Sequence, residues 1–428
     1  MTKIKDHSND LLRANAILEK NRMFFFNGNF YLNSNNYWQP VEDGVIKSFI
    51  LKLLQGGYKQ TTVKNILDIL QIKTKKTDEE INLNEKKGLI NCLNGFLEIK
   101  TMKLIKHNPK TQNYFSTNQF QINYAPGVQC PRWLQFLDEI FEGDSDKEDK
   151  KFFLQEFAGY CLTTDTRHQK ALFLLGNGSN GKSIILDVLE AILGKTNSSN
   201  LDFDQLGKQF TTNLLIGKLI NICNDIDYKS SSSYGTFKRI VSGETILADR
   251  KNREPIKFRP HCKLIFAANR LPQATDTSRG YFRRLFVLKF NNSFEGANRD
   301  LNLKSKLMSE LDGIFLWMIS GLQKLTDTKK FTIPQSSYSE LEKYLENSNS
   351  VIAFVKEICE IKKEKDCWVG YQELYNAYRM FCHSSGWKCF KKTEFRQELC
   401  DRQLKGEVIF NRHGDRGNHF QNIKIISN

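Results

Sequence analysis

A run of small and polar residues separates an apolar segment from a helical pattern in "ALFLLGNGSNGKSIILDVLEAIL", residues 171–193. Its glycines, lysine and serine follow the spacing G-x-x-x-x-G-K-[ST] of a phosphate-binding loop. Small residues let backbone N–H groups turn toward phosphate oxygens, and the next helix adds its positive N-terminal end. The expected nucleotide contacts are Gly176, Asn177, Gly178, Ser179, Asn180, Gly181, Lys182 and Ser183. The loop therefore predicts a nucleoside triphosphate site, and an incidental glycine-rich turn is the weaker alternative.

Within this loop, two side chains have chemical roles. Lys182 is expected to pair with the β and γ phosphates, and the Ser183 hydroxyl to ligate Mg²⁺. A second metal ligand is expected at the end of a neighbouring strand, and "KLINICNDIDY" (218–228) supplies Asp225 and Asp227. Residues two apart in a strand share a face, so both carboxylates could point at the metal. Asp227 serves equally well as a solvated strand end, and the sequence leaves these two roles open.

Two further segments offer polar groups suited to phosphate hydrolysis. The strand-like "CKLIFAAN" (262–269) ends in Asn269, which could orient the attacking water, although asparagine also caps turns. In "TSRGYFRRLFVLKF" (277–290), Arg283 and Arg284 precede another strand pattern. An arginine can stabilise the charge that develops on a transferred phosphoryl group. These groups predict a nucleoside triphosphate and Mg²⁺ as cofactors.

Basic side chains gather in "ILADRKNREPIKF" (246–258), where two strand-like arms flank a charged turn. A hairpin there would project Arg250, Lys251 and Arg253 together. Such a tip is either a solvated turn or a contact for nucleic acid.

The elements that must position these groups predict an α/β fold. Apolar strand patterns alternate with helical or loop segments, which is typical of a largely parallel sheet. Before them the segments "MFFFNGNFYL" (23–32) and "YFSTNQFQINY" (114–124) look β-like, and the last 80 or so residues show three helical patterns followed by two strand patterns, the order of a winged helix. The expected units are an N-terminal α+β domain (1–130), a helical collar (131–165), an ATPase domain (166–330), a linker (331–345) and a winged-helix-like domain (346–428).

Composition limits the partners and the compartment. The 428 residues carry a formal charge of +15, which favours a polyanion as partner, although a lysine-rich soluble surface would show the same excess. Ten cysteines have no zinc-site spacing and are expected to be reduced thiols. No signal-like or membrane-spanning segment is visible, so a cytoplasmic location is expected, the host cytoplasm if the protein is phage-encoded.

Taken in order, these blocks resemble the superfamily 3 helicases of the poxvirus, phage and plasmid type. "GNGSNGKS" is similar to the family's A motif, "LINICNDID" to its B motif, "FKRIVSGETILADRK" to its B′ motif and "LIFAANRLP" to its C motif. The N-terminal region and the winged-helix-like end are also similar to segments associated with these helicases. The resemblance implies an AAA+ ATPase with a central parallel sheet that assembles as a ring, usually a hexamer, around DNA.

The same resemblance assigns roles. Lys182 and Ser183 correspond to phosphate and Mg²⁺ binding, Asp225 to the acidic B position, Asn269 to sensor 1, and Arg283 or Arg284 to a finger that acts in the neighbouring subunit. Lys238 and the Arg250–Arg253 segment correspond to the B′ region, which faces DNA in the ring. Many relatives have two adjacent acids in the B motif, whereas Asn224 precedes Asp225 here, so the residue that orients water stays open between Asp225 and Asp227.

The resulting hypothesis is an ATP-dependent replicative DNA helicase that moves on single-stranded DNA and unwinds forked duplex. A primase or polymerase domain is expected as partner, in the same longer chain or as a separate protein. The alternative is a nucleotide-dependent assembly or initiator module that binds DNA without unwinding it. A generic phosphate-loop kinase or GTPase is less consistent, because it leaves the B′ hairpin and the arginine pair without a role.

Overall fold

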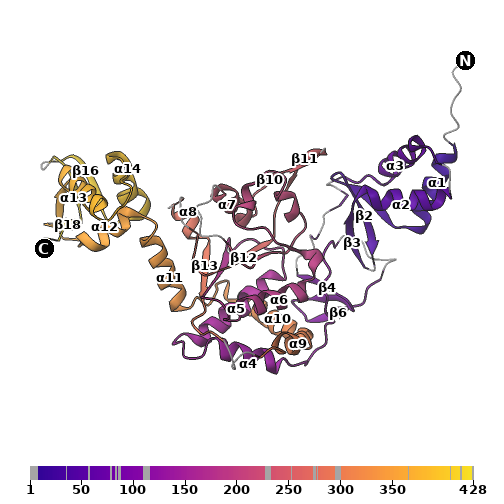
Figure 1. Ribbon diagram of the computed structural model, residues 1–428, viewed down its shortest axis with the longest axis horizontal. Coiled ribbons are helices and arrows are strands. Elements are labelled where there is room, and N and C mark those ends of the chain that lie inside the picture. Colours follow the sequence, from indigo (N-terminus) through magenta and orange to yellow (C-terminus); the bar gives the residue numbers. More distant parts are fainter. Residues whose placement is uncertain are drawn as a thin grey trace, which may run out of the picture.

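A computed structural model describes most of the chain between residues 8 and 426. The ranges it describes are 8–34, 36–55, 58–77, 80–81, 84, 88–108, 116–226, 233–251, 253–272, 276, 278–294, 300–364, 366–404, 406–414 and 417–426. The chain forms a central body with a smaller module at each end (Figure 1). In the described part of the chain, no helix combines the length and the apolar character needed to cross a bilayer.

The N-terminal module combines three helices with a small antiparallel sheet. Its elements are α1 (Ser8–Lys20), β1 (Met23–Phe26), β2 (Asn29–Ser34), β3 (Tyr37–Val41), α2 (Asp43–Leu54) and α3 (Gln60–Thr74). The sheet order is β1-β2-β3, and "MFFFNGNFYL" forms the β1–β2 hairpin that its pattern indicates. Apolar residues of the helices and the sheet, among them Ile17, Phe30, Ile50 and Leu70, form a core of their own.

A second antiparallel sheet packs against the central body. It consists of β4 (Leu89–Cys92), β5 (Gly95–Glu98) and β6 (Lys103–Ile105). Ile90 and Leu97 of this sheet belong to the same hydrophobic core as the helices of the central body. The expectation of a strand within 114–124 was wrong for the described residues 116–124, because their polar groups bond to other loops: the Asn118 amide donates to Asn197 Oδ1 and to the carbonyl of Gly217.

The central body is built on a five-stranded, fully parallel sheet. Its strands are β7 (Ala171–Leu175), β8 (Ser198–Ser199), β9 (Ile220–Cys223), β12 (Lys263–Ala268) and β13 (Leu285–Lys289), in the order β13-β7-β12-β9-β8. Four of these strands match the apolar runs of the sequence, and the α/β prediction is confirmed. Because all strands are parallel, the residues that follow them meet at one edge of the sheet.

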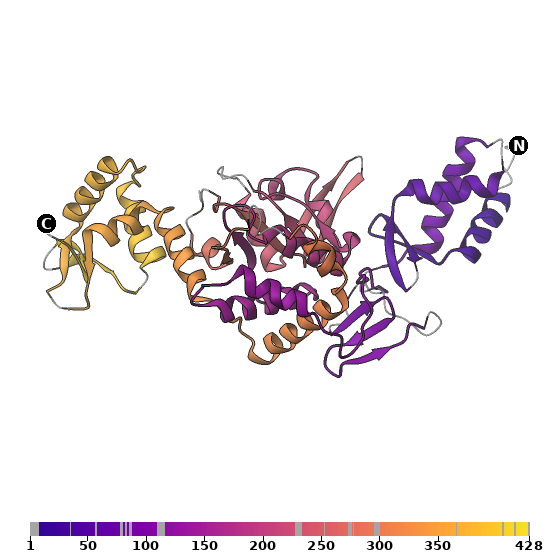
Figure 2. The ribbon, with the colours of Figure 1, turned by 60° about the horizontal axis from the view of Figure 1, so that its bottom comes forward.

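Helices cover both faces of this sheet (Figure 2). The alternation along β7 sends Leu172 and Leu174 into one core and Phe173 and Leu175 into another. The first core includes α4 (Pro131–Ile140), α5 (Lys147–Cys161), α6 (Lys182–Leu193), α9 (Leu303–Met308) and α10 (Leu311–Thr328). The second includes η2 (Gln205–Gly207), η3 (Thr212–Leu215), α7 (Tyr234–Ser242), α8 (Arg279–Phe282) and the start of the hairpin β10 (Ile246–Arg250) and β11 (Arg253–Phe258).

The helix α11 (Gln335–Glu346) leads to the C-terminal module (Figure 1). Its elements are α12 (Ser350–Ile358), β14 (Cys359–Ile361), β15 (Trp368–Gly370), α13 (Tyr371–Ser384), α14 (Lys392–Arg396), the π-helical segment η5 (Gln397–Gln403), β16 (Ile409–Gly414), β17 (Gly417–Gln421) and β18 (Ile423–Ile425). They form sheets β14-β18 and β15-β17-β16 around a separate apolar core. Three helical regions and a β16–β17 ribbon follow the expected order, and the winged-helix assignment and domain boundaries stay predictions.

Candidate nucleotide site

The phosphate-binding loop joins β7 to α6, as its pattern predicts. Close packing explains its glycines. A Cβ on Gly176 would lie 2.7 Å from the carbonyl oxygen of Phe290, and Gly181 has a φ of +88°, with its would-be Cβ 2.9 Å from Ile140. The loop is also tied to the segment after β13, because the Phe294 amide donates to the Ser179 carbonyl oxygen at 2.7 Å. The loop is therefore held between the end of α4 and the end of β13.

Lys182 is the buried cation of this loop. Its ammonium nitrogen donates to the Gly176 carbonyl oxygen at 2.5 Å and to Asn180 Oδ1 at 2.8 Å. Burial lowers the pKa of Lys182, and the negative charge of Asp225 opposes that shift. Ser183 and the loop residues from Asn177 to Ser179 are exposed. The hydroxyl and the loop backbone are thus open to an incoming phosphate.

The polar residues expected beside the loop follow the two neighbouring strands. Asp225 lies two residues beyond β9, and Asn269 directly follows β12; both are exposed at the edge where the loop begins. The Gly176 amide donates to the Ala268 carbonyl oxygen at 3.2 Å, which places the ends of β7 and β12 side by side. Asp227 lies outside the described residues.

The donors at this edge fit a magnesium ion held jointly with a nucleotide. The Ser183 hydroxyl and the Asp225 carboxylate are hard oxygen ligands, and Mg²⁺ commonly takes one or two such groups together with phosphates and water. Among the described residues, no group of three or more His, Cys, Asp and Glu side chains could hold a metal by itself.

Both candidate arginines lie at the opposite edge of the sheet. The Ala171 amide, at the start of β7, donates to the Arg284 carbonyl oxygen at 2.8 Å, so the pair stands a full strand away from the loop. Arg284 is only 7% exposed, and its guanidinium donates to Ser242 Oγ at 2.7 and 3.1 Å and to the Gly280 carbonyl oxygen. Arg283 is exposed and donates to Gln169 Oε1 at 2.9 Å. Neither side chain can reach the nucleotide loop of its own chain.

The basic residues of the B′ region lie on two elements, α7 and the β10–β11 hairpin. Lys238, on α7, donates to Asp276 Oδ2 at 2.7 Å in a partly exposed ion pair. The hairpin prediction is confirmed, since β10 and β11 pair antiparallel and Arg250 faces Arg253 across the strands. Lys251 is exposed at the turn, and the side chain of Arg253 lies outside the described structure.

An aromatic residue near this hairpin escaped the sequence analysis. Phe210 is 44% exposed and has a φ of +65°, an uncommon conformation for a bulky residue. It precedes η3, which packs against β10, and the neighbouring Leu214 and Leu247 are also about half exposed. Only the apolar character of Phe210 is visible in the sequence, because its exposure depends on the turn between η2 and η3.

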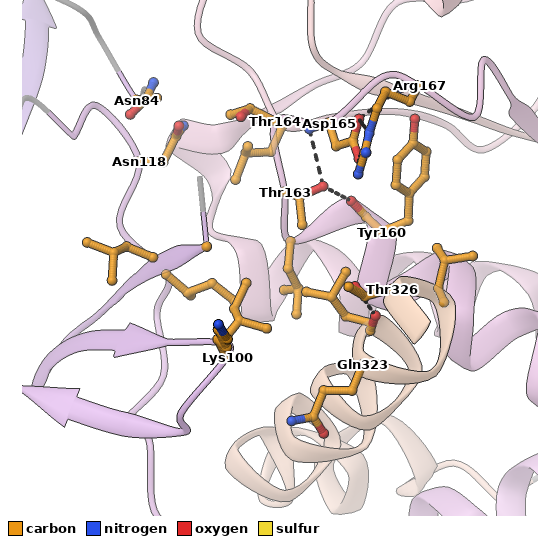
Figure 3. Close-up of a pocket in the computed structure, with 18 of the residues that line it drawn as sticks. Asn84, Lys100, Asn118, Tyr160, Thr163, Thr164, Asp165, Arg167, Gln323 and Thr326 are labelled. Atoms are coloured by element: carbon orange, nitrogen blue, oxygen red, sulfur yellow. Dashed lines mark hydrogen bonds and ion pairs between the residues drawn. The ribbon is translucent and has the colours of Figure 1, made fainter. Parts of the chain in front are cut away.

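A spacious cavity lies away from the nucleotide site. It has a volume of about 1170 Å³ and lies between the β4–β5 sheet, the segment after α5 and the end of α10 (Figure 3). Its walls include Thr163 to Asp165, which precede β7, and Leu219, which precedes β9, so it opens at the edge opposite the loop. Thr163, Asp165 and Arg167 bond to one another around its rim, as Figure 3 shows.

Comparisons with known proteins show what the chain is similar to. A family model described as "D5 N terminal like" matches residues 14–142, and a "Family of unknown function (DUF5906)" matches residues 174–284, which include the loop and both arginines. The chain is 29% identical over 273 residues to "Putative helicase L207/L206" of Acanthamoeba polyphaga mimivirus, covering 61% of this chain and 27% of that protein. It is 22% identical over 249 residues to "Putative helicase 121R" of Invertebrate iridescent virus 3, covering 54% and 26%.

Two further matches complete the comparison. The "Uncharacterized mitochondrial protein ymf21" of Marchantia polymorpha is 29% identical over 99 residues, covering 23% of this chain and 53% of that protein. The apo structure of the NrS-1 C terminal region (305–718) has the same fold, with a TM-score of 0.56 at 16% identity and coverage of 97% of this chain and 99% of that one. The chain spans about a quarter to a half of the length of the curated relatives. The two family models and the viral proteins named as putative helicases make the chain similar to the D5-type superfamily 3 helicases, and the shared fold agrees with that similarity.

Proposed function

We propose that the chain is the ATPase motor of a ring-forming DNA helicase, which hydrolyses ATP with Mg²⁺ and translocates on single-stranded DNA. One observation carries this proposal: the loop lysine, Asp225 and Asn269 follow parallel strands at one edge of the sheet, whereas Arg283 stands exposed at the other. Arg283 can therefore meet a nucleotide at the first edge only when it belongs to another copy of the chain. The strand order, with the loop strand between β13 and β12, supports an AAA+-type core.

The proposed roles follow from the chemistry of each side chain. Lys182 would neutralise phosphate charge, and Ser183 and Asp225 would hold a magnesium ion, which would supply positive charge to the phosphates. Asn269 and the carboxylate of Asp225 orient the attacking water. Arg283 of one copy stabilises the charge that develops on the γ-phosphate in its neighbour, while Arg284 fixes the backbone between α8 and β13.

DNA contact is assigned to the basic hairpin and the aromatic residue beside it. Arg250, Lys251 and Arg253 supply positive charge for phosphates, and the exposed ring of Phe210 supplies a stacking surface for a base. Basic residues combined with an aromatic platform suit single-stranded DNA without sequence preference. We include a primase or polymerase partner in the proposal because the related NrS-1 structure is itself the C-terminal region of a longer protein.

A hydrolysis assay tests the proposal. Purified protein is incubated with ATP and Mg²⁺, with and without oligo(dT), at two salt concentrations, and forked duplex is then supplied to measure strand separation. The expected result is turnover that DNA stimulates and salt weakens, together with unwinding. If the nucleotide drives assembly but is not hydrolysed, the motor proposal would be contradicted. The result would instead support the alternative, an assembly or initiator module.

A further inference from the structure

The N-terminal module contacts the hairpin to which DNA binding is assigned. Nη1 of Arg250 donates to the carbonyl oxygen of Asn27, in the β1–β2 turn, at 3.3 Å. The same guanidinium donates through Nε and Nη2 to the Glu254 carbonyl oxygen of its own hairpin, at 3.1 and 2.8 Å. The hairpin tip points toward the N-terminal module, as Figure 1 shows. Residues more than 200 positions apart in the sequence therefore meet at one arginine.

The turn is shaped to receive this guanidinium. Asn27 has a φ of +48° and Gly28 a φ of +71°, the left-handed pair that a two-residue Asn-Gly hairpin turn needs. A Cβ on Gly28 would lie 2.9 Å from Nη2 and 3.0 Å from Nη1 of Arg250, closer than van der Waals contact allows. Any larger residue at this position would therefore have to push the arginine away.

The charge of Arg250 also affects a tyrosine on β2, outside the β1–β2 turn. Tyr31, on β2, is buried, and burial raises its pKa to about 12 while the positive charge of Arg250 opposes that rise. The charge of Arg250 therefore acts on Tyr31 of β2 as well as on the turn.

The two carbonyl partners are weaker acceptors than a DNA phosphate. Both are uncharged oxygens, whereas a phosphate can accept two parallel, charge-assisted bonds from one guanidinium. A phosphate placed at the hairpin can therefore replace Asn27 without leaving the arginine unsatisfied. The turn and the DNA backbone would then compete for the same group.

We propose that the β1–β2 turn is an internal docking surface for the B′ hairpin, which occupies Arg250 until single-stranded DNA displaces it. This inference rests on the proposed role of the hairpin in DNA binding. The inference gives the N-terminal module a function. The docked module lowers the affinity of the free protein for DNA, and it leaves the hairpin when a DNA strand binds there.

The test compares the binding of labelled oligo(dT) to the full chain and its variants by fluorescence anisotropy. Gly28→Ala removes the space for Arg250, and we expect an increase in affinity of about three- to tenfold, the range expected when one hydrogen bond to a charged group no longer competes. Gly127→Ala is the matched control, since Gly127 also has a positive φ, +84°, but nothing within 4 Å of its would-be Cβ. Arg250→Ala should lower affinity, and the double variant Gly28→Ala/Arg250→Ala should match Arg250→Ala alone.

The outcomes separate this inference from the proposed function. Unchanged or lower affinity of Gly28→Ala, with a loss in Arg250→Ala, would overturn the docking role and leave the hairpin as a DNA contact. No effect of Arg250→Ala would overturn the hairpin assignment itself.

Hydrogen exchange on the unaltered protein gives a second readout that needs no substitution. Adding oligo(dT) should speed amide exchange in residues 23–32 and slow it in residues 246–258, because the turn is released as the hairpin is covered. Slower exchange in both segments would contradict displacement, since the module would then stay docked on the DNA-bound hairpin.

Discussion

The side-chain oxygen of Asn180 lies 2.8 Å from the ammonium nitrogen of Lys182, inside the loop that both residues belong to. Together with the Gly176 carbonyl oxygen, it holds the buried cation in place. Lys182 is thus preorganised by two oxygens of its own loop. We expect the phosphates of a bound nucleotide to take over these contacts, because charged oxygens bind an ammonium more strongly than neutral ones.

Replacement of the loop lysine should abolish turnover. For Lys182→Ala we expect ATP hydrolysis to fall by at least about 100-fold, the size of effect seen when one group that stabilises developing charge is lost. Steady-state phosphate release is the measurement. Lys195→Ala, which removes an exposed lysine just after α6, is the control. Full activity of the Lys182 variant would contradict the site.

Loss of the carboxylate at the end of β9 should separate binding from chemistry. Asp225→Asn should retain nucleotide binding while the hydrolysis rate falls by about 10²-fold or more, because Mg²⁺ and the attacking water lose their anionic partner. Nucleotide affinity and kcat are measured side by side. Asn224→Ala changes the exposed neighbour and should keep near-normal turnover. If Asn224→Ala were as impaired in hydrolysis as Asp225→Asn, the assignment of this role to Asp225 would be contradicted.

The two adjacent arginines should fail in different ways. Arg283→Ala should fold normally, hydrolyse ATP poorly alone, and recover partial activity when mixed with Lys182→Ala, since each copy supplies what the other lacks. Arg284→Ala should lose about 1–3 kcal/mol of stability, because its buried guanidinium holds Ser242 and Gly280. Thermal melting and mixing assays distinguish the two. Arg279→Ala, exposed on the same short helix, is the control, and absence of recovery in the mixture would argue against shared sites.

The hairpin and its aromatic neighbour should respond differently to salt. Lys251→Ala should weaken oligo(dT) binding and reduce the slope of log affinity against log salt by about 0.7, because one phosphate contact is lost. Phe210→Ala should weaken binding by about 1–3 kcal/mol without changing that slope, since stacking releases no counterions. Anisotropy titrations across salt concentrations are the measurement. Equal slope changes in the two variants would contradict the division of roles.

Burial of Lys263 should make stability depend on alkaline pH. Burial lowers the pKa of this lysine from 10.5 to about 8, although it donates to the carbonyl oxygens of Thr163 and His261. Between these values the unfolded chain binds more protons, so the contribution of Lys263 to stability rises with pH from about 8 to 10.5 and is lowest below pH 8. The free energy of unfolding of the unaltered protein minus that of Lys263→Met should therefore increase by roughly 3 kcal/mol over this window. If this difference in unfolding free energy did not change with pH, the lowered pKa of the buried Lys263 would be contradicted.

The sequence by itself determined the phosphate loop, four strands of the parallel sheet, the β10–β11 hairpin and the resemblance to the superfamily 3 helicases. These features depend on local patterns: glycine spacing before Lys182, apolar runs such as 171–175, and a charged turn between two strand-like arms. Local sequence is sufficient for these features because each pattern allows few backbone conformations that both form the backbone hydrogen bonds and bury the apolar side chains.

Only the tertiary structure decided which of these groups are buried, exposed or joined. Arg283 and Arg284 are identical in type and adjacent in sequence, yet the packing of α8 against α7 buries one and leaves the other in solvent. The exposure of Phe210 and the contact between Asn27 and Arg250 likewise depend on segments distant along the chain. Such contacts are set by how whole elements pack, and no local pattern encodes the partner that a side chain will meet after the chain has folded.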